Sequence, residues 1–433
     1  MAGVSLAWLL DGACDVILLE ARDSIGGNVQ SVEVDLDGRQ VVVDMGAQYF
    51  HPALYPAYTA LLEHLGLGDP VSSEPGAARA FPASITLTAG LESTPRFVSP
   101  ALPERWWPFL APWNYPGIWA FALGFFAAKA REDLNQPWDL TLEEWLPTLG
   151  LSREQWEGML LPWAASLFSG SVDQARGVSA RAAMIFAAKA LPPNIFDPIL
   201  YYVLTSGMIE VLSRMIAQCS NLTILTDAPV LDVSRGPASG FTLRCARRTV
   251  HVDDLVFASS GPPTARLLTG LREATPQLAA LSSMEFHDAR LALHTDPLYA
   301  STNPDFRSFL NCDLEGDFCE ASMWLATVVD APPPTASKLW KSWITHRERP
   351  KQVLYETAFT HMLPTPATLR AQDGLASLQG QDGLWFAGGY LYPYDSQETA
   401  LLSALRVALG LHVTSARSQM LLAALGTSTA MPF

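Results

Sequence analysis

Positive charge is scarce in this sequence, and charge of either sign is limited. The 433 residues include 28 Lys and Arg against 43 Asp and Glu, which gives a net charge of −15, and charged residues make up 16% of the chain. A surface this acidic repels phosphate backbones, so nucleic acid is excluded as a partner. The 49% hydrophobic content excludes disorder, and the length fits about two domains.

Cysteine is scarce as well. The five cysteines are an odd number scattered through a long chain, so they do not form a disulfide framework. Cys312 and Cys319 lie seven residues apart without the His or Cys neighbours that a zinc site needs, and we predict no bound metal. Free thiols fit a reducing compartment, and residues 1–10 lack the basic start of a signal peptide. We therefore expect a cytoplasmic protein.

No uncharged stretch is long enough, without interruption, to cross a membrane. Residues 106–128 carry no charge and nine aromatic side chains. Pro108, Pro112 and Pro116 leave only residues 117–128 free for an unbroken helix. Such a helix spans about 18 Å, well short of the ~30 Å hydrocarbon core. The remaining alternatives are a buried helix, a peripheral membrane contact, or the mouth of an apolar tunnel.

The amino-terminal residues match the second half of a dinucleotide-binding βαβ unit. Residues 1–10 are apolar at helical spacing, and residues 15–20 have the pattern of a buried parallel strand that ends in an acid. In such a unit this acid, here Glu20, accepts the hydroxyls of the adenosine ribose. Gly3 stands where helix and strand pack closely. The first strand and the first two glycines of the motif are absent, so the chain begins inside the motif.

Residues 20–28 read Glu-Ala-Arg-Asp-Ser-Ile-Gly-Gly-Asn, and a serine follows at position 31. This stretch resembles the E-A-R-x-x-x-G-G-R/N-x-x-S/T sequence of flavin-containing amine oxidases and phytoene-desaturase-like enzymes. In that superfamily the glycine pair lets backbone N–H groups approach the pyrophosphate of FAD. The resemblance therefore implies FAD as the cofactor, with contacts from Gly3, Glu20, Ala21, Arg22, Gly26, Gly27 and Asn28.

Two further stretches resemble the same superfamily. Residues 41–49 are similar to its D-x-G-A-x-x-F/Y segment, whose backbone runs along the isoalloxazine ring. This similarity implies flavin contacts from Gly46, Ala47 and Gln48. Residues 222–235 are similar to the adenine-facing strand of the superfamily, and the resemblance implies that the Val230 backbone bonds to the adenine edge.

The carboxyl-terminal part resembles the last FAD-binding element of the superfamily. Residues 383–390 have the pattern of a final parallel strand, and residues 395–408 that of an amphipathic helix capped by Asp395 or Ser396. In the superfamily this helix directs its positive end at the flavin. The resemblance implies contacts from Gly388, Gly389, Ser396, Thr399 and Ala400. The usual Ala-Gly-Asp is Ala-Gly-Gly here, so a carboxylate at position 389 is missing.

The Gly-Gly-Tyr variant and the His-Thr-Asp element at 294–296 resemble those of the NAD/FAD-binding amine oxidase-like subset. The resemblance implies an α/β fold: a Rossmann-like FAD-binding domain of glutathione reductase type, without its first strand, and an inserted α+β substrate domain. We predict that the FAD-binding domain comprises 1–50, 205–270 and 365–415, that the substrate domain comprises 51–204 and 271–364, and that 416–433 form a tail.

The resemblance implies an FAD-dependent oxidoreductase that transfers a hydride equivalent from an amine or an apolar C–H substrate to flavin N5. His294, Tyr390 and Tyr392 are the candidates for substrate contact. Amine oxidases of the superfamily often use a lysine that holds a water near the flavin. No lysine here stands in a sequence context that matches, so we name no catalytic base; the five are Lys129, Lys189, Lys338, Lys341 and Lys351.

Two alternatives to this activity stay open. One is an FAD-dependent isomerase that moves a double bond in a lipid or polyene. The other is a truncated, non-catalytic flavoprotein-like binding protein, which the absent first strand and the glycine at position 389 favour. The oligomeric state is open too.

Overall fold

The computed structural model describes residues 1–68, 77–91, 94–99, 127–192, 197, 199–236, 240–329 and 334–426. The prediction for residues 106–128 lies outside this part of the chain, apart from its last two positions. No helix in the described ranges combines the length and the apolar character that crossing a bilayer requires.

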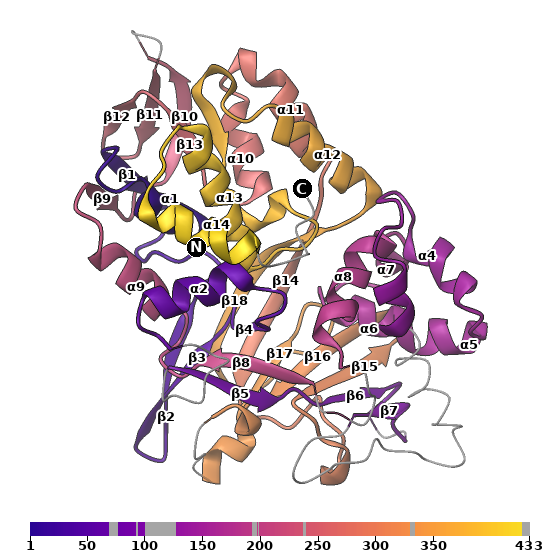
Figure 1. The fold of residues 1–433 in the computed structure, drawn as a ribbon. Helices are drawn as coiled ribbons and strands as arrows, with labels where there is room; N and C mark the ends of the chain where they lie inside the picture. Colours follow the sequence, from indigo (N-terminus) through magenta and orange to yellow (C-terminus); the bar gives the residue numbers. More distant parts are fainter. Residues whose placement is uncertain are drawn as a thin grey trace.

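Two parallel strand pairs form the core of one half of the molecule (Figure 1). β1 (Val16–Leu19) pairs with β9 (Leu222–Leu225), and β13 (Leu255–Phe257) pairs with β19 (Leu384–Phe386). Segments far apart in sequence therefore lie side by side, as crossover connections require. The helix and strand predicted over 1–10 and 15–20 are present as α1 (Ala2–Leu10) and β1.

Helices cover these parallel pairs and bury an apolar core. α1 packs on α13 and α9, and α2 packs on α13 and α14. Residues 416–426, predicted to belong to a tail, form α14, whose Leu421 is fully buried in this core. The bounds are α2 (Pro56–His64), α9 (Ile209–Ala217), α13 (Gln397–Gly410) and α14 (Ala416–Gly426).

An antiparallel sheet and three helices extend the same half of the molecule. The sheet has the order β10-β11-β12, and its apolar side chains share a core with β13, β19 and the helices. The elements are β10 (Val230–Arg235), β11 (Phe241–Cys245), β12 (Thr249–Val252), α10 (Gly261–Leu268), α11 (Thr275–Ser282) and α12 (Pro366–Ser377).

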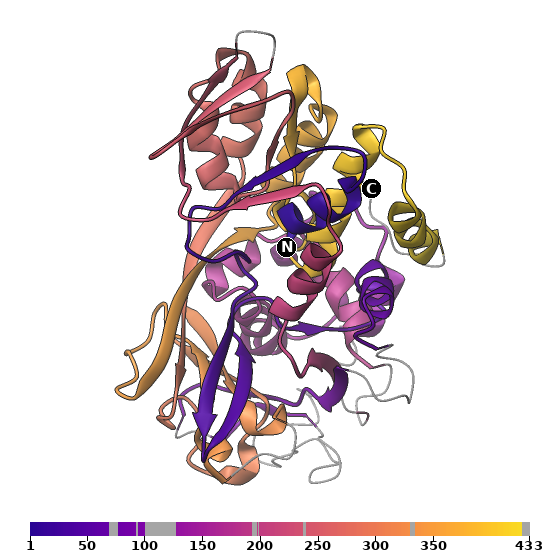
Figure 2. The same ribbon diagram turned by 90° about the vertical axis from the view of Figure 1, so that its left-hand side faces the viewer.

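A seven-stranded sheet dominates the other half, with the order β18-β14-β17-β16-β15-β6-β7. Its strands come from both predicted insertions, and the long strands β14 and β18 run from one half of the molecule to the other (Figures 1 and 2). The strands are β6 (Ile85–Thr88), β7 (Phe97–Val98), β14 (Glu285–His294), β15 (Leu310–Glu315), β16 (Phe318–Trp324), β17 (Trp340–Trp343) and β18 (Val353–Leu363).

Short helices and two small sheets complete this half. The helices are α4 (Leu142–Trp145), α5 (Arg153–Gln155), α6 (Leu161–Ser166), α7 (Val172–Arg176) and α8 (Ala180–Ala190). The hairpin β2 (Ser31–Leu36) and β3 (Arg39–Asp44) stands beside a sheet of order β4-β8-β5, formed by β4 (Tyr49–Phe50), β8 (Leu200–Leu204) and β5 (Ala78–Pro82). The domain boundaries stay a prediction.

The central strands of the seven-stranded sheet have two faces of different chemistry. Successive side chains of a strand point to opposite faces, and the register pairs Leu293 and Met323 with Lys341, and Ala292 and Ser322 with Ser342. We define the lysine face by Leu291, Leu293, Met323, Lys341, Trp343 and Phe359. We define the arginine face, named after Arg347, by Ala292, His294, Glu320, Ser322 and Ser342.

Candidate functional site

The carboxyl end of β1 lies against the start of β10. Glu20 follows β1, and its carboxylate accepts a hydrogen bond from the Arg22 N–H at 2.9 Å. The backbone of Glu20 accepts from Ala228 N–H at 2.9 Å, and the backbone of Arg22 accepts from Asp227 N–H at 2.8 Å. These bonds continue the β1–β9 pairing, and they bring Glu20, Ala21 and Arg22 to the strand that begins at Val230.

Gly3 and Gly27, near the end of β1, lack side chains for two different reasons. A Cβ added at Gly3 would lie 3.0 Å from Leu18 Cδ1 and 3.3 Å from Ala258 Cβ, so α1 packs on β1 as closely as the spacing predicts. Gly27 has φ +63°, and a Cβ there would meet nothing within 4 Å. Its backbone therefore borders open space, and a phosphate group could approach it without contacting a side chain.

The segment after β3 lies against the glycine loop. A Cβ at Gly46 would lie only 2.0 Å from the Asn28 carbonyl oxygen, and the Ala47 N–H donates to the same oxygen at 2.9 Å. That Cβ would also lie 2.9 Å from the ring of Phe359, on the lysine face. The backbone around Asn28 and the backbone of Gly46 and Ala47 thus lie against each other, and Phe359 of the seven-stranded sheet packs beside them.

The amino terminus of α13 reaches the same segment. Ser396 is its N-cap, as predicted, and the Ser396 hydroxyl accepts from Thr399 N–H at 3.2 Å in a capping box. The Gln397 side chain donates to the Tyr49 carbonyl oxygen at 2.9 Å. The positive end of the helix therefore lies beside the segment that contains Gly46, and Ala400 is buried behind it.

The glycine at position 389 has a carboxylate beside it after all. A Cβ at Gly389 would lie 1.9 Å from Oδ1 of Asp395, so the Asp395 carboxylate occupies the space of the missing side chain. Desolvation by the surrounding protein raises the pKa of the Asp395 carboxyl to about 6, although the amino-terminal ammonium group acts in the opposite direction. The neighbouring Gly388 N–H donates to the Ser403 hydroxyl at 2.8 Å.

Two buried carboxylates hold helix amino termini near this region. Asp44 accepts from the Met208 N–H at 3.0 and 3.1 Å, directly before α9, and from the Ser31 hydroxyl. Glu398 accepts from the Ala57 and Tyr58 N–H groups of α2 at 3.0 and 2.6 Å. Burial raises the pKa of Asp44 to about 6 and that of Glu398 to about 7. The two carboxylates therefore cap the starts of α9 and α2, and they fix these helices relative to β3 and α13.

Lys341 is the functional candidate that the sequence analysis missed. Its side chain is 1% exposed, and Nζ donates to the Asp44 carbonyl oxygen at 2.8 Å, to the Met45 carbonyl oxygen at 3.4 Å and to Gln48 Oε1. Burial lowers its pKa to about 7, although the Asp44 carboxylate acts in the opposite direction. The signal in the sequence was one lysine between two tryptophans of a short strand, Trp-Lys-Ser-Trp.

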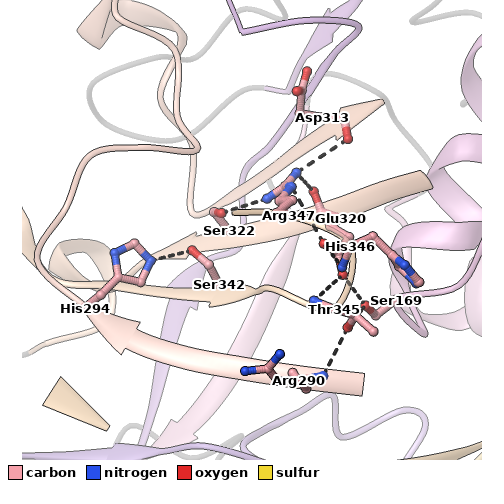
Figure 3. Close-up of polar contacts among 10 residues, drawn as sticks. All are labelled: Ser169, Arg290, His294, Asp313, Glu320, Ser322, Ser342, Thr345, His346 and Arg347. Atoms are coloured by element: carbon pink, nitrogen blue, oxygen red, sulfur yellow. Dashed lines mark hydrogen bonds and ion pairs between the residues drawn. The ribbon is translucent and has the colours of Figure 1, made fainter. Parts of the chain in front are cut away.

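His294 does not join this group. It lies on the arginine face, where its Nε2 is 2.8 Å from the Ser342 hydroxyl, and burial lowers its pKa to about 4 (Figure 3). Tyr390 and Tyr392 are buried in the cores around the parallel strands, and Tyr390 packs edge-on to Phe286. The structure therefore does not bring these three substrate candidates to Lys341.

The Met1 amine donates to the Gly26 carbonyl oxygen at 3.3 Å, and the carboxylates of Glu20 and Asp395 both act on its charge. The acid at the strand end, the glycine loop and the start of α13 therefore lie near one another, which is the arrangement of dinucleotide-binding folds. A family model described as flavin containing amine oxidoreductase matches residues 1–289, and the chain belongs to that family. It is an FAD-dependent oxidoreductase, and the residues above fit FAD because they leave backbone open where the pyrophosphate would lie. The described residues contain no cluster of three or more His, Cys, Asp or Glu suited to a metal ion.

Solved structures share the fold at low sequence identity. A double mutant of putrescine oxidase is 16% identical with a TM-score of 0.63, and the match covers 95% of this chain and 97% of that chain. Cyclohexylamine oxidase from Brevibacterium oxydans IH-35A is 16% identical with a TM-score of 0.59 and the same coverage. A CLA-producing fatty acid isomerase from P. acnes is 13% identical, with a TM-score of 0.62 and coverage of 94% and 96%. A search of curated proteins finds no match.

Proposed function

We propose that this FAD-dependent oxidoreductase oxidises a small amine that carries an apolar substituent. The bound FAD would accept the two electrons and the hydrogen released from the C–H bond. The observation that carries the proposal is Lys341, a buried amine on the lysine face that contacts residues 44–48. The family resemblance implies that this segment runs along the flavin ring.

Four of the predicted cofactor residues have roles in this proposal that follow from their positions. Glu20 would bind the ribose, and the open backbone at Gly27 would bind the pyrophosphate. The amino terminus of α13, capped by Ser396, would stabilise negative charge on the reduced ring. Gly46 would let its segment pack directly on the Asn28 backbone, and so hold the two backbone segments together beside the ring.

Lys341 suits proton transfer in the same place. An amine with a pKa near 7 is about half protonated at neutral pH, so it can hold a water or accept a proton from a substrate ammonium group. Burial within the sheet keeps bulk water away from it. The Tyr49 ring, 5.6 Å from Nζ, forms an aromatic wall beside it.

A pocket next to this region supports an apolar substituent on the substrate. Gln48 and Tyr49 lie among its lining residues, and its other walls are mostly aliphatic. The described lining includes one acid, Asp44, whose carboxylate already accepts bonds from Ser31 and Met208. A second ammonium group would find no available carboxylate there, which favours a monoamine over a diamine. The aliphatic side chains are Val41, Val42, Val43, Val203, Leu204, Leu325, Val328 and Val329.

The test is anaerobic reduction of the bound flavin by n-hexylamine, benzylamine and putrescine, followed by absorbance. We expect the two monoamines to reduce the flavin faster than the diamine. Lys341→Met should slow reduction by about 10²-fold or more, because it removes the group that handles the proton. Lys351→Met, at an exposed lysine, is the matched control and should leave the rate unchanged.

Three results would contradict the proposal. If Lys341→Met reduced the flavin at the rate of the wild type, Lys341 would have no part in the chemistry. If a polyene were converted without oxygen uptake while no amine reduced the flavin, the isomerase alternative would hold. A protein that remained colourless after incubation with FAD would favour the non-catalytic alternative.

A further inference from the structure

Gln48 bridges two neighbouring strands of the lysine face. Its Oε1 accepts from Lys341 Nζ, and its Nε2 lies 3.2 Å from Met323 Sδ. Met323 and Lys341 are direct cross-strand partners in β16 and β17. The Gln48 amide, which is not part of the sheet, therefore contacts both members of this cross-strand pair. Its contact with Met323 orients the amide oxygen toward the Lys341 amine. The family resemblance had assigned Gln48 to the cofactor alone.

The bonds of Lys341 match the protonated amine in number. An ammonium group has three N–H donors and no acceptor. The structure provides three oxygens, the carbonyls of Asp44 and Met45 and the amide of Gln48. The two carbonyl oxygens belong to backbone that is fixed by the Asp44 cap on α9. Gln48 is therefore the one partner among the three that a side-chain substitution can remove.

We propose that Gln48 is a positioning residue for Lys341, and that its amide oxygen keeps the Lys341 nitrogen over residues 44–48 and favours the protonated form of the amine. The contacts alone support this role, whatever reaction the enzyme performs; its consequence for catalysis rests on the proposed function. Without the amide, the nitrogen would keep two backbone acceptors, and the charged form would lose a charge-assisted hydrogen bond.

The other groups around Lys341 do not replace this contact. Asp44, on β3, is the titratable group that acts on the Lys341 charge, and its carboxylate is turned to Ser31 and Met208. Tyr49 contributes the face of its ring, and Met323 contributes a thioether from β16. Asp44, Tyr49 and Met323 therefore offer no available anionic oxygen to the amine. The charged form of Lys341 depends on the Gln48 amide oxygen for its third hydrogen bond.

The chain allows a direct measurement because it contains only five lysines. The FAD-loaded protein would be labelled with ¹³Cε-lysine and titrated by NMR, and the Lys341 signal would be assigned by its loss in Lys341→Met. In Gln48→Met the pKa of Lys341 should fall by about one unit or more, since the charged form loses an acceptor. In Gln48→Glu it should rise, because a carboxylate replaces the amide.

Two variants keep this test decisive. Gln381→Met, at an exposed glutamine whose side chain donates to the Ser377 carbonyl oxygen, is the matched control and should leave the Lys341 titration unchanged. Gln48→Asn keeps an amide but shortens its reach, and should lower the pKa in the same direction if Gln48→Met does not fold. A folded Gln48 variant, either Met or Asn, with the wild-type titration would overturn the proposal.

A second readout separates this inference from the proposed function. If Lys341 also handles the substrate proton, the pH profile of flavin reduction should move in Gln48→Met by the same amount as the NMR titration. A shifted titration with an unmoved pH profile would support Gln48 as a positioning residue and contradict the catalytic role of Lys341. An unshifted titration would contradict the positioning role itself, whatever the profile.

Discussion

The two faces of the seven-stranded sheet hold their buried charges in different ways. On the arginine face, Glu320 accepts from the Ser169 hydroxyl at 2.8 Å and from the Thr345 and His346 N–H groups, and Arg347 lies 3.9 Å from its carboxylate (Figure 3). On the lysine face, Lys341 contacts two carbonyls and one amide. The first charge has a charged partner, and the second has only neutral partners in direct contact.

This difference separates structural charges from reactive ones. Arginine stays protonated under all ordinary conditions, and with a buried carboxylate as its partner it fixes the chain in one arrangement. A lysine without a carboxylate in contact can change its protonation state when burial lowers its pKa. The same sheet therefore carries a rigid ionic network on one face and a group suited to proton transfer on the other.

At neutral pH, the largest effect on stability should come from the arginine face. Arg347→Met leaves the Glu320 carboxylate buried without its cation and removes bonds to the Ser322 hydroxyl and the Glu320 carbonyl. We expect the free energy of unfolding to fall by about 3 kcal/mol. Urea unfolding measures it, with Arg349→Met, at an exposed partner of Glu356, as the control. A loss no larger than that of the control would show that the pair is not structural.

The lysine face should respond to pH instead. Burial lowers the pKa of Lys341 from 10.5 to about 7, so between these values the unfolded chain holds a proton that the folded chain has released. The stability of the wild type relative to Lys341→Met should therefore rise with pH across this window, by up to about 1.4 kcal/mol per pH unit. It should be flat below about pH 7. Parallel stability curves for the two proteins would contradict the lowered pKa.

Local sequence patterns predicted the elements that surround the cofactor region. The helix over 1–10, the strand ending at Glu20 and the Ser396 cap depend on residues close in sequence, and the structure has all three. The close packing at Gly3 was also predictable, because helix–strand spacing in a βαβ unit is nearly constant. The role of these residues in binding FAD stays a prediction.

The features that the sequence could not predict depend on strand register and on contacts between distant segments. Lys341 stands in a strand of four residues, and its partners lie almost three hundred residues earlier, so no local pattern connects them. His294 does end a strand, as expected, but alternation alone does not tell which face covers the site. Asp395 replaces the carboxylate absent at position 389 because a turn folds it back, and spacing in the sequence gives no sign of this.

The smallest expected effect on stability concerns His294, on the arginine face. Ser342→Ala removes the hydroxyl that pairs with His294 Nε2 and leaves a buried ring nitrogen without it. We expect a loss of about 1–2 kcal/mol in the free energy of unfolding, against little change for the exposed Ser213→Ala control. The rate of flavin reduction by amines should stay at the wild-type value, because Ser342 and Lys341 point to opposite faces. A slowed reduction in Ser342→Ala at unchanged stability would instead place His294 in contact with the substrate and join the two faces in one site.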